Sequence, residues 1–409
     1  MLDKISQIYY NSRAIYNRKI IMQDEQLVEK LKSKSRFKRL NALKTLAKNE
    51  EYAEDYGMDA NINVVCRTTF SCFDTTPALA AYRLAKNGMP IIGVVDYASL
   101  SAAKEIYKAE KILKKPYYTG AETECIGSDG VVRKMLSVGV PHKNAKPFDL
   151  ELYFYRKLRN EFASSLIDGL NSRFKKYDIH LAAPKNSFYR ATSTEDIFIR
   201  LAESIRNKFE DGKAVIDFVS DELKIELSDE DYKRLIDLSN VFYIADLAKV
   251  LFTKYKMKFP VRKYKKVSEF AASSDYYGGI SAVMLSDNLL DTIKFAIDNH
   301  IKGIFFYLDK LENYNFAPKE IYDACVGSGL LPIGLIVADY PKKNLEFKFE
   351  SEETAQKYKD VALSIVGNEI ASSINLGDGM FSARTIENTP IFTERIRLFS
   401  RIGSKGSVK

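Results

Sequence analysis

Histidine is scarce in this chain, with three residues among 409, and tryptophan is absent. Histidine is the most common side-chain ligand of transition metals in proteins, so the sequence excludes a site that needs several imidazoles for each of two or three metals. Cysteine is also sparse and shows no C-x2-C spacing, which excludes a zinc knuckle and the dense disulfide framework of a small secreted domain. The four cysteines are Cys66, Cys72, Cys125 and Cys325.

Long apolar runs are missing too. No stretch approaches the ~18 apolar residues of a membrane span, and the first residues lack the apolar core of a signal peptide. We therefore expect a cytoplasmic globular protein with no membrane partner. The net charge is +8, from 62 basic and 54 acidic residues. The basic residues are spread along the chain, whereas nucleic-acid-binding proteins concentrate them on one face, so nucleic acid is not expected as a partner.

What the sequence does contain is a regular alternation that begins near residue 62. Short apolar runs alternate with amphipathic segments of about a dozen residues, which is typical of βα units and a parallel sheet. Seven strands can close into a barrel, so we predict an α/β fold of this kind. The predicted strands cover residues 62–66, 91–95, 117–122, 135–140, 280–285, 303–308 and 332–337.

Two segments stand outside this alternation. Residues 1–61 are polar and show leucines at helical spacing, which predicts an N-terminal helical segment. Residues 147–261 contain no candidate strand, and we expect helices over 150–174, 194–209 and 228–252. We interpret them as a helical insertion that divides the barrel into 62–146 and 262–409, the second part ending in a C-terminal helix and tail.

Polar side chains follow several of the predicted strands. In a parallel barrel the functional groups gather at the C-terminal ends of the strands, because the loops there vary while the barrel stays rigid. The candidate pocket residues at these ends are Arg67, Thr68, Asp96, Tyr97, Glu122, His142 and Asp339.

Three of these segments carry a resemblance to a known family. The sequences Arg-Thr-Thr-Phe-Ser at 67–71, Asp-Tyr-Ala-Ser-Leu at 96–100 and Gly-Ala-Glu at 120–122 resemble motifs of the PHP (polymerase and histidinol phosphatase) family. That family's motifs read His-x-His-Thr, Asp-His and a glutamate after a glycine. The resemblance is strongest over residues 62–142. It implies a distorted seven-stranded (β/α) barrel that binds two or three divalent metals and hydrolyses phosphate esters.

The chain departs from this pattern where the metal ligands should be. Val65 and Arg67 stand at the two histidine positions of the first motif, and Tyr97 stands at the histidine of the second. The chain therefore looks like a degenerate member of the family. Three groups remain as ligands for a single divalent metal, manganese or zinc, whereas a two-metal cluster needs about twice that number. These three are Asp96, Glu122 and His142.

Arg67 brings a permanent cation to a site that keeps two carboxylates. We expect its guanidinium to pair with Asp96 or Glu122 and to replace the charge of the lost metal. Two alternatives stay open, namely that Arg67 binds a phosphate or carboxylate together with Thr68 and Tyr97, or that it points into solvent. Asp96 has an alternative role as well, since it could cap the helix that follows it.

These observations favour a PHP-like barrel that is a pseudoenzyme. We expect it to have no cofactor and no multi-metal phosphoesterase activity, and to keep a pocket for a small anionic ligand. The alternative is a metal-dependent phosphoric ester hydrolase with one metal, in which a metal-bound hydroxide attacks phosphorus and Arg67 stabilises the developing charge. Stoichiometric metal in the purified protein would distinguish the two. The sequence does not define the oligomeric state.

Overall fold

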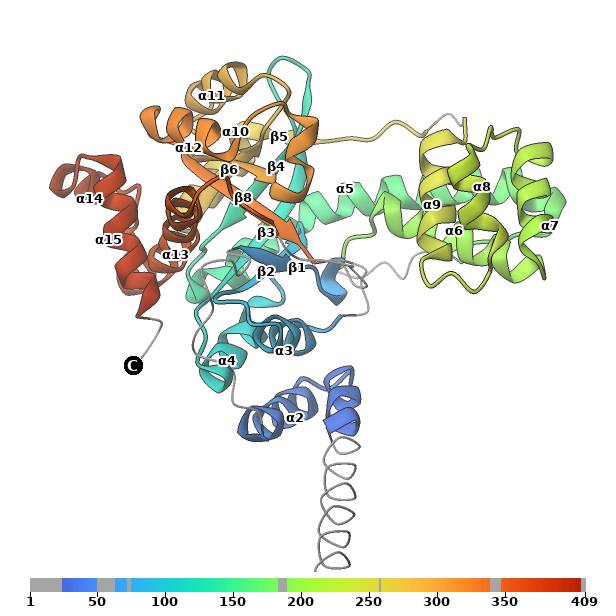
Figure 1. Cartoon of the computed structure of the whole chain (residues 1–409). Coiled ribbons are helices and arrows are strands. Elements are labelled where there is room, and N and C mark those ends of the chain that lie inside the picture. Colours follow the sequence, from blue (N-terminus) through green and yellow to red (C-terminus); the bar gives the residue numbers. More distant parts are fainter. Residues whose placement is uncertain are drawn as a thin grey trace, which may run out of the picture. The chain divides into compact units, whose positions relative to one another are not determined.

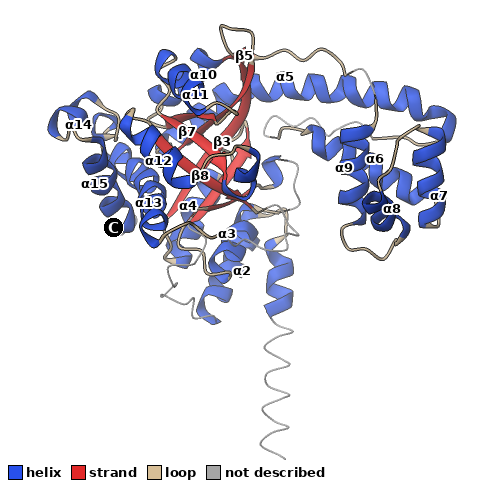
Figure 2. Cartoon of the chain, turned by 45° about the horizontal axis from the view of Figure 1, so that its top comes forward, coloured by secondary structure: helices blue, strands red, loops and turns tan. Residues whose placement is uncertain are grey.

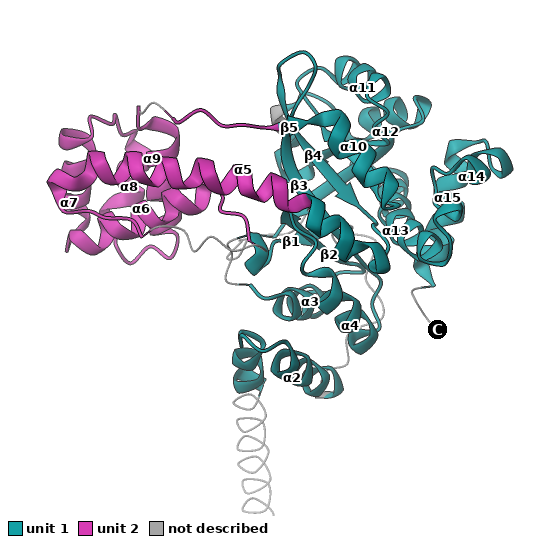
Figure 3. Cartoon of the chain, turned by 180° about the vertical axis from the view of Figure 1, so that it is seen from behind, with its two compact units in different colours: residues 1–151, 265–409 teal, residues 152–264 magenta. Residues whose placement is uncertain are grey.

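A computed structural model describes residues 24–49, 63–71, 75–182, 190–256, 259–338 and 347–405. The chain divides into two compact units, one formed by Met1–Glu151 with Lys265–Lys409 and the other by Leu152–Tyr264 (Figure 3). Among the described helices, none combines the length and the apolar composition needed to cross a membrane.

The first unit is built on a closed barrel of seven strands (Figure 2). Neighbouring strands pair in the order β1-β2-β3-β4-β6-β7-β8, and β8 pairs with β1 to close the ring. The two-residue β5 (Lys265–Lys266) extends the end of β3. The predicted α/β barrel is therefore confirmed. The strands are β1 (Val64–Cys66), β2 (Ile92–Tyr97), β3 (Tyr117–Ile126), β4 (Val132–Val138), β6 (Ile280–Met284), β7 (Gly303–Tyr307) and β8 (Leu331–Val337).

One strand runs against the others. β4 is antiparallel to both β3 and β6, so the prediction of a fully parallel sheet is wrong at this strand. The reason is the short connection of β3 to β4 over residues 127–131, which is a hairpin turn and leaves no room for a crossover helix. Gly130 adopts φ +77° in this turn. The start of β4 therefore lies beside the C-terminal ends of the parallel strands, and its end lies beside their N-terminal ends.

Helices surround the barrel (Figure 1). The helix after β1 begins at Pro77, because the Thr76 hydroxyl accepts a hydrogen bond from the amide of Leu79 and proline suits the first helical turn. The surrounding helices are α3 (Pro77–Lys86), α4 (Ala103–Leu113), α10 (Val267–Tyr276), α11 (Leu289–Asp298), α12 (Pro318–Gly327) and α13 (Glu352–Ile374).

The chain termini contribute helices to this unit as well. Within the described part of the predicted N-terminal segment, residues 24–31 are helical and α2 (Arg36–Asn49) follows. The rest of that segment, 1–23 and 50–61, lies outside the described residues. At the other end, α14 (Ala383–Asn388) and α15 (Phe392–Ser404) follow α13. The backbones of α13 and α15 touch, since a Cβ atom on Gly367 would lie 1.9 Å from the Phe399 carbonyl oxygen.

The second unit is helical and has a hydrophobic core of its own, which includes Phe174, Phe198 and Leu247. α5 (His142–Phe174) begins in the first unit and continues into the second; it starts before the predicted position and passes through Pro147. The expected helix over 228–252 is instead two helices, because the Asp237 side chain binds the amide and hydroxyl of Ser239 in a turn between them. The remaining helices are α6 (Thr194–Lys208), α7 (Gly212–Asp217), α8 (Asp229–Ile236) and α9 (Tyr243–Lys254).

A buried carboxyl group joins α13 to the barrel. The Tyr117 hydroxyl on β3 donates a hydrogen bond to Glu369, which is 3% exposed. Burial and the neighbouring charge of Glu110 raise the pKa of Glu369 to about 8, although the hydrogen bonds from Tyr117 and from the Thr119 backbone oppose the shift. Glu369 is therefore protonated at neutral pH in the folded protein.

This carboxyl group should make stability fall as pH rises. An unfolded glutamate loses its proton near its ordinary pKa of 4.5, whereas folded Glu369 keeps the proton until about pH 8. Between these values the folded state binds more protons, so Glu369 lowers the free energy of unfolding by up to ~1.4 kcal/mol per pH unit. Glu369→Gln lacks this titration. Urea unfolding from pH 5 to pH 8 should show wild type losing stability relative to the variant, and parallel curves would contradict this.

Candidate functional site

Asp96, the penultimate residue of β2, fixes the loop that follows β1. Its carboxylate is buried and accepts hydrogen bonds from the Thr68 amide (2.7 Å), the Thr68 hydroxyl (2.7 Å) and the Ser71 hydroxyl (2.6 Å). The Tyr97 amide in turn donates to the Ser71 hydroxyl. Burial raises the pKa of Asp96 to about 6, while Ser71, Thr68 and the charge of Arg67 oppose the shift. Both carboxylate oxygens therefore hold the short 3-10 turn at Thr69–Ser71.

The loop between β2 and α4 has a different acceptor, Asp149 of α5. This buried carboxylate accepts hydrogen bonds from the Leu100 amide (2.7 Å), the Ser101 hydroxyl (2.8 Å) and the Ser99 hydroxyl (3.2 Å). Asp149 therefore holds the segment that precedes α4, and the N-cap residue of α4, Ala102, makes no side-chain capping bond. The sequence does not identify Asp149, because the serines at 99 and 101 indicate a need for an acceptor but not which distant residue supplies it.

Arg67 and Tyr97 contact each other beside Glu122. The Arg67 guanidinium carbon lies 4.1 Å from the centre of the Tyr97 ring, and Nη2 lies 3.4 Å from Glu122 Oε2. The side chains of Arg67 and Glu122 are 11% and 5% exposed, so this ion pair is largely shielded from water. Positions 67 and 97 are those at which the family resemblance expects imidazole ligands. In the structure the Arg67 and Tyr97 side chains stack on one another and face the Glu122 carboxylate.

Two more residues reach Glu122 that the sequence analysis missed. The Tyr307 hydroxyl at the end of β7 donates to Oε2 (2.9 Å), and Lys134 Nζ lies 3.7 Å from Oε1. Lys134 comes from the start of β4, which reaches this end of the barrel only because that strand is antiparallel. Burial and the charge of Glu122 raise the pKa of Tyr307 well above its usual range, so the hydroxyl remains a donor. Lys310 Nζ lies 5.1 Å from the Tyr307 ring centre.

His142 does not join these residues. It follows β4 and begins α5, so it lies beside the N-terminal ends of the parallel strands, where its ring stacks on Tyr107 with centroids 4.2 Å apart. Burial and the charges of Lys104 and Lys111 lower the pKa of His142, which leaves the imidazole neutral. The remaining candidate, Asp339, lies outside the described residues.

The residues brought together do not fit a divalent metal. The oxygens of Glu122 face two cations and a phenol, and those of Asp96 hold Thr68 and Ser71. The third candidate ligand, His142, lies at the other end of the barrel. Across the six described ranges, no group of three or more His, Cys, Asp or Glu side chains is arranged to hold a metal ion.

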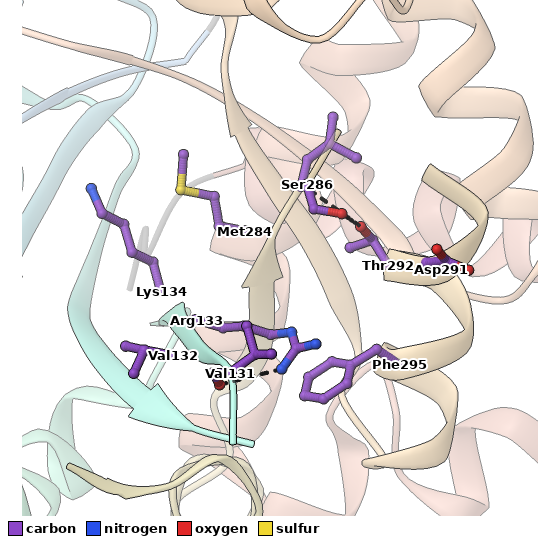
Figure 4. A pocket seen from close by; sticks show the side chains of 10 residues that line it. Val131, Val132, Arg133, Lys134, Met284, Ser286, Asp291, Thr292 and Phe295 are labelled. Atoms are coloured by element: carbon purple, nitrogen blue, oxygen red, sulfur yellow. Dashed lines mark hydrogen bonds between the residues drawn. The ribbon is translucent and has the colours of Figure 1, made fainter. Parts of the chain in front are cut away.

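A cavity of about 310 Å³ opens next to Lys134 (Figure 4). It lies between the start of β4 and the end of β6 with the beginning of α11, hence at the same end of the barrel as Glu122. Lys134 lines the cavity and also contacts Glu122. The lining residues are Val131, Val132, Arg133, Lys134, Met284, Leu285, Ser286, Asp291, Thr292 and Phe295.

Comparison with known proteins gives weakly similar solved structures, of which two illustrate the level of similarity. No protein-family model matches the chain, and no curated protein matches it. A candidate metal-dependent phosphoesterase from Bifidobacterium adolescentis shares 14% identity at a TM-score of 0.44, with 72% of this chain and 94% of that chain covered. An amidohydrolase from Chromobacterium violaceum, solved with sulfate and no metal, shares 12% identity at a TM-score of 0.47. That match covers 73% of this chain and 97% of the amidohydrolase chain. Similarity at this level assigns neither a family nor an activity.

Replacement of Asp96 should destabilise the whole barrel end. Asp96→Ala leaves three buried donors without an acceptor, and each such group costs about 1–3 kcal/mol. We expect the free energy of unfolding to fall by roughly 3–5 kcal/mol in urea titration. The exposed Asp298→Ala on α11 is the control and should behave like wild type. Equal stability of the two variants would show that the loop does not depend on Asp96.

Proposed function

We propose that the C-terminal end of this PHP-like barrel binds a small anion and does not carry out metal-dependent phosphoester hydrolysis. One observation carries the proposal: at two positions where the resemblance expects imidazole ligands, Arg67 and Tyr97 stack on each other and Arg67 pairs with Glu122. A guanidinium against the carboxylate repels a divalent cation and offers hydrogen-bond donors to an anion.

The neighbouring cations can take part in binding. The Lys134 side chain is 38% exposed, and its 3.7 Å separation from Glu122 is longer than a direct hydrogen bond. Lys310 is exposed and lies over the face of Tyr307. Both ammonium groups can therefore turn toward a ligand at low cost, while the shielded Arg67 keeps a fixed position. Phosphate and carboxylate are the anions that such a set of Arg, Lys and Tyr donors recognises.

The same groups are poorly suited to turnover. The Glu122 oxygens already contact Arg67, Lys134 and the Tyr307 hydroxyl, so they are engaged within the protein. Tyr307 remains protonated because burial and Glu122 hold its pKa high. A single-metal phosphoesterase would require Glu122 to leave Arg67 and Asp96 to leave Thr68 and Ser71, which breaks the buried hydrogen bonds that hold the loop.

Calorimetric titration of the metal-free protein with inorganic phosphate tests anion binding. We expect wild type to bind, and Arg67→Met and Lys134→Gln each to weaken binding about 10-fold, which is ~1.4 kcal/mol. Lys108→Gln, an exposed change on α4, is the charge-matched control and should bind like wild type. Thermal unfolding verifies that every variant is folded. Phosphate binding that is equal in all four proteins would contradict the proposal.

A turnover assay tests the alternative function, metal-dependent phosphoester hydrolysis. Wild type is incubated with a phosphate monoester and added manganese or zinc, and released phosphate is measured. We expect no release above the protein-free control. Metal-dependent release that Glu122→Gln abolishes would overturn the proposal in favour of a single-metal phosphoesterase.

A further inference from the structure

The cavity beside Lys134 has an apolar wall that faces solvent. Val131 and Val132 are 51% and 40% exposed at the start of β4, although valine usually becomes buried. Met284 and Phe295 line the cavity from β6 and α11. A volume of about 310 Å³ reaches the lower end of the range of about 300–1,000 Å³ that is usual for small-molecule pockets.

The polar groups of this wall are largely engaged within the protein. The Arg133 guanidinium makes two hydrogen bonds to Asp129 (2.9 and 2.6 Å) and lies 3.7 Å from the centre of the Phe295 ring. The Thr292 hydroxyl contacts the Ser286 hydroxyl (2.7 Å) and donates to the Asn288 carbonyl at the start of α11. These groups support the local structure, and a ligand meets mainly the flat Arg133–Phe295 stack and the apolar side chains.

Two charged side chains remain at opposite sides of the cavity. Figure 4 shows Lys134 on the side of β4 and Asp291 on the side of α11. Asp291 is exposed and lies in the first turn of α11. Lys134 also reaches the Arg67–Glu122 site through its contact with Glu122. Lys134 therefore links the cavity to the Arg67–Glu122 site, and Asp291 places a negative charge at the other side of the cavity.

We propose that the cavity holds the apolar or aromatic body of a ligand that carries a single anionic group, and that this group binds at Lys134. The inference rests on the anion site proposed above and specifies its ligand class. Inorganic phosphate would fill only the headgroup position, whereas an aryl phosphate would also cover Val132 and Phe295. Asp291 would disfavour a second acidic group at the far end of the ligand, since like charges repel in a partly desolvated site.

Phenyl phosphate and inorganic phosphate are compared by calorimetry on the full-length protein. Removing roughly 60–100 Å² of apolar surface from water at about 25 cal/mol per Å² gives an expected gain of about 10- to 70-fold for phenyl phosphate. Val132→Phe fills the cavity without a change of charge. In this variant phenyl phosphate should bind no more tightly than inorganic phosphate, and the affinity for inorganic phosphate should equal that of wild type. Val241→Phe on the helical unit, at a position that is 83% exposed, is the control for added aromatic surface.

A second ligand tests the role of Asp291. Phenyl phosphate with a carboxylate in the para position should bind wild type more weakly than phenyl phosphate does, and Asp291→Asn should remove this difference. If phenyl phosphate binds no better than phosphate, or equally well to Val132→Phe, the cavity inference is wrong while the anion site stands. If neither compound binds to the wild type, the anion site itself is wrong.

Discussion

The end of this barrel depends on the compensation of one buried carboxylate, Glu122. An ionised carboxylate that is 5% exposed is costly unless cations and hydrogen-bond donors surround it. Arg67 from the loop after β1, Lys134 from β4 and Tyr307 from β7 supply those partners. Side chains from three parts of the barrel thus contact one carboxylate, and loss of Glu122 would remove the ion pair that Arg67 makes with it. In a metal-binding barrel a metal ion would perform this neutralisation, so the ion pair and the metal are alternative solutions to one electrostatic problem.

The direction of β4 decides which residues can take part. Because this strand runs antiparallel, its first residues lie at the end of the barrel that carries Glu122 and its last residues lie at the other end. The antiparallel strand brings Lys134 to the site and moves His142 to a stack with Tyr107. The same strand presents Val131 and Val132 beside the cavity. The hairpin at 127–131 therefore shapes both the surroundings of Glu122 and the apolar cavity beside Lys134.

The existence of the seven strands was predictable, since buried barrel strands are short apolar runs with amphipathic helices between them. The direction of each strand was harder to predict. The Gly-Ser-Asp-Gly sequence at 127–130, between two strands, is typical of a hairpin and could have indicated that β4 is antiparallel. Arg67, Asp96 and Glu122 could be placed at strand ends from the motifs. The partners Asp149, Lys134 and Tyr307 could not be identified, because hydrogen bonds between residues far apart in sequence leave no local pattern.

Metal content of the purified protein is the most direct test of the central claim, that a cation of the chain itself balances Glu122. The protein is purified without chelators, incubated with manganese or with zinc, desalted and subjected to elemental analysis. The ion-pair account predicts metal well below one equivalent per chain in both samples. One equivalent or more in wild type, lost in Glu122→Gln and retained in the control Lys108→Gln, would contradict it.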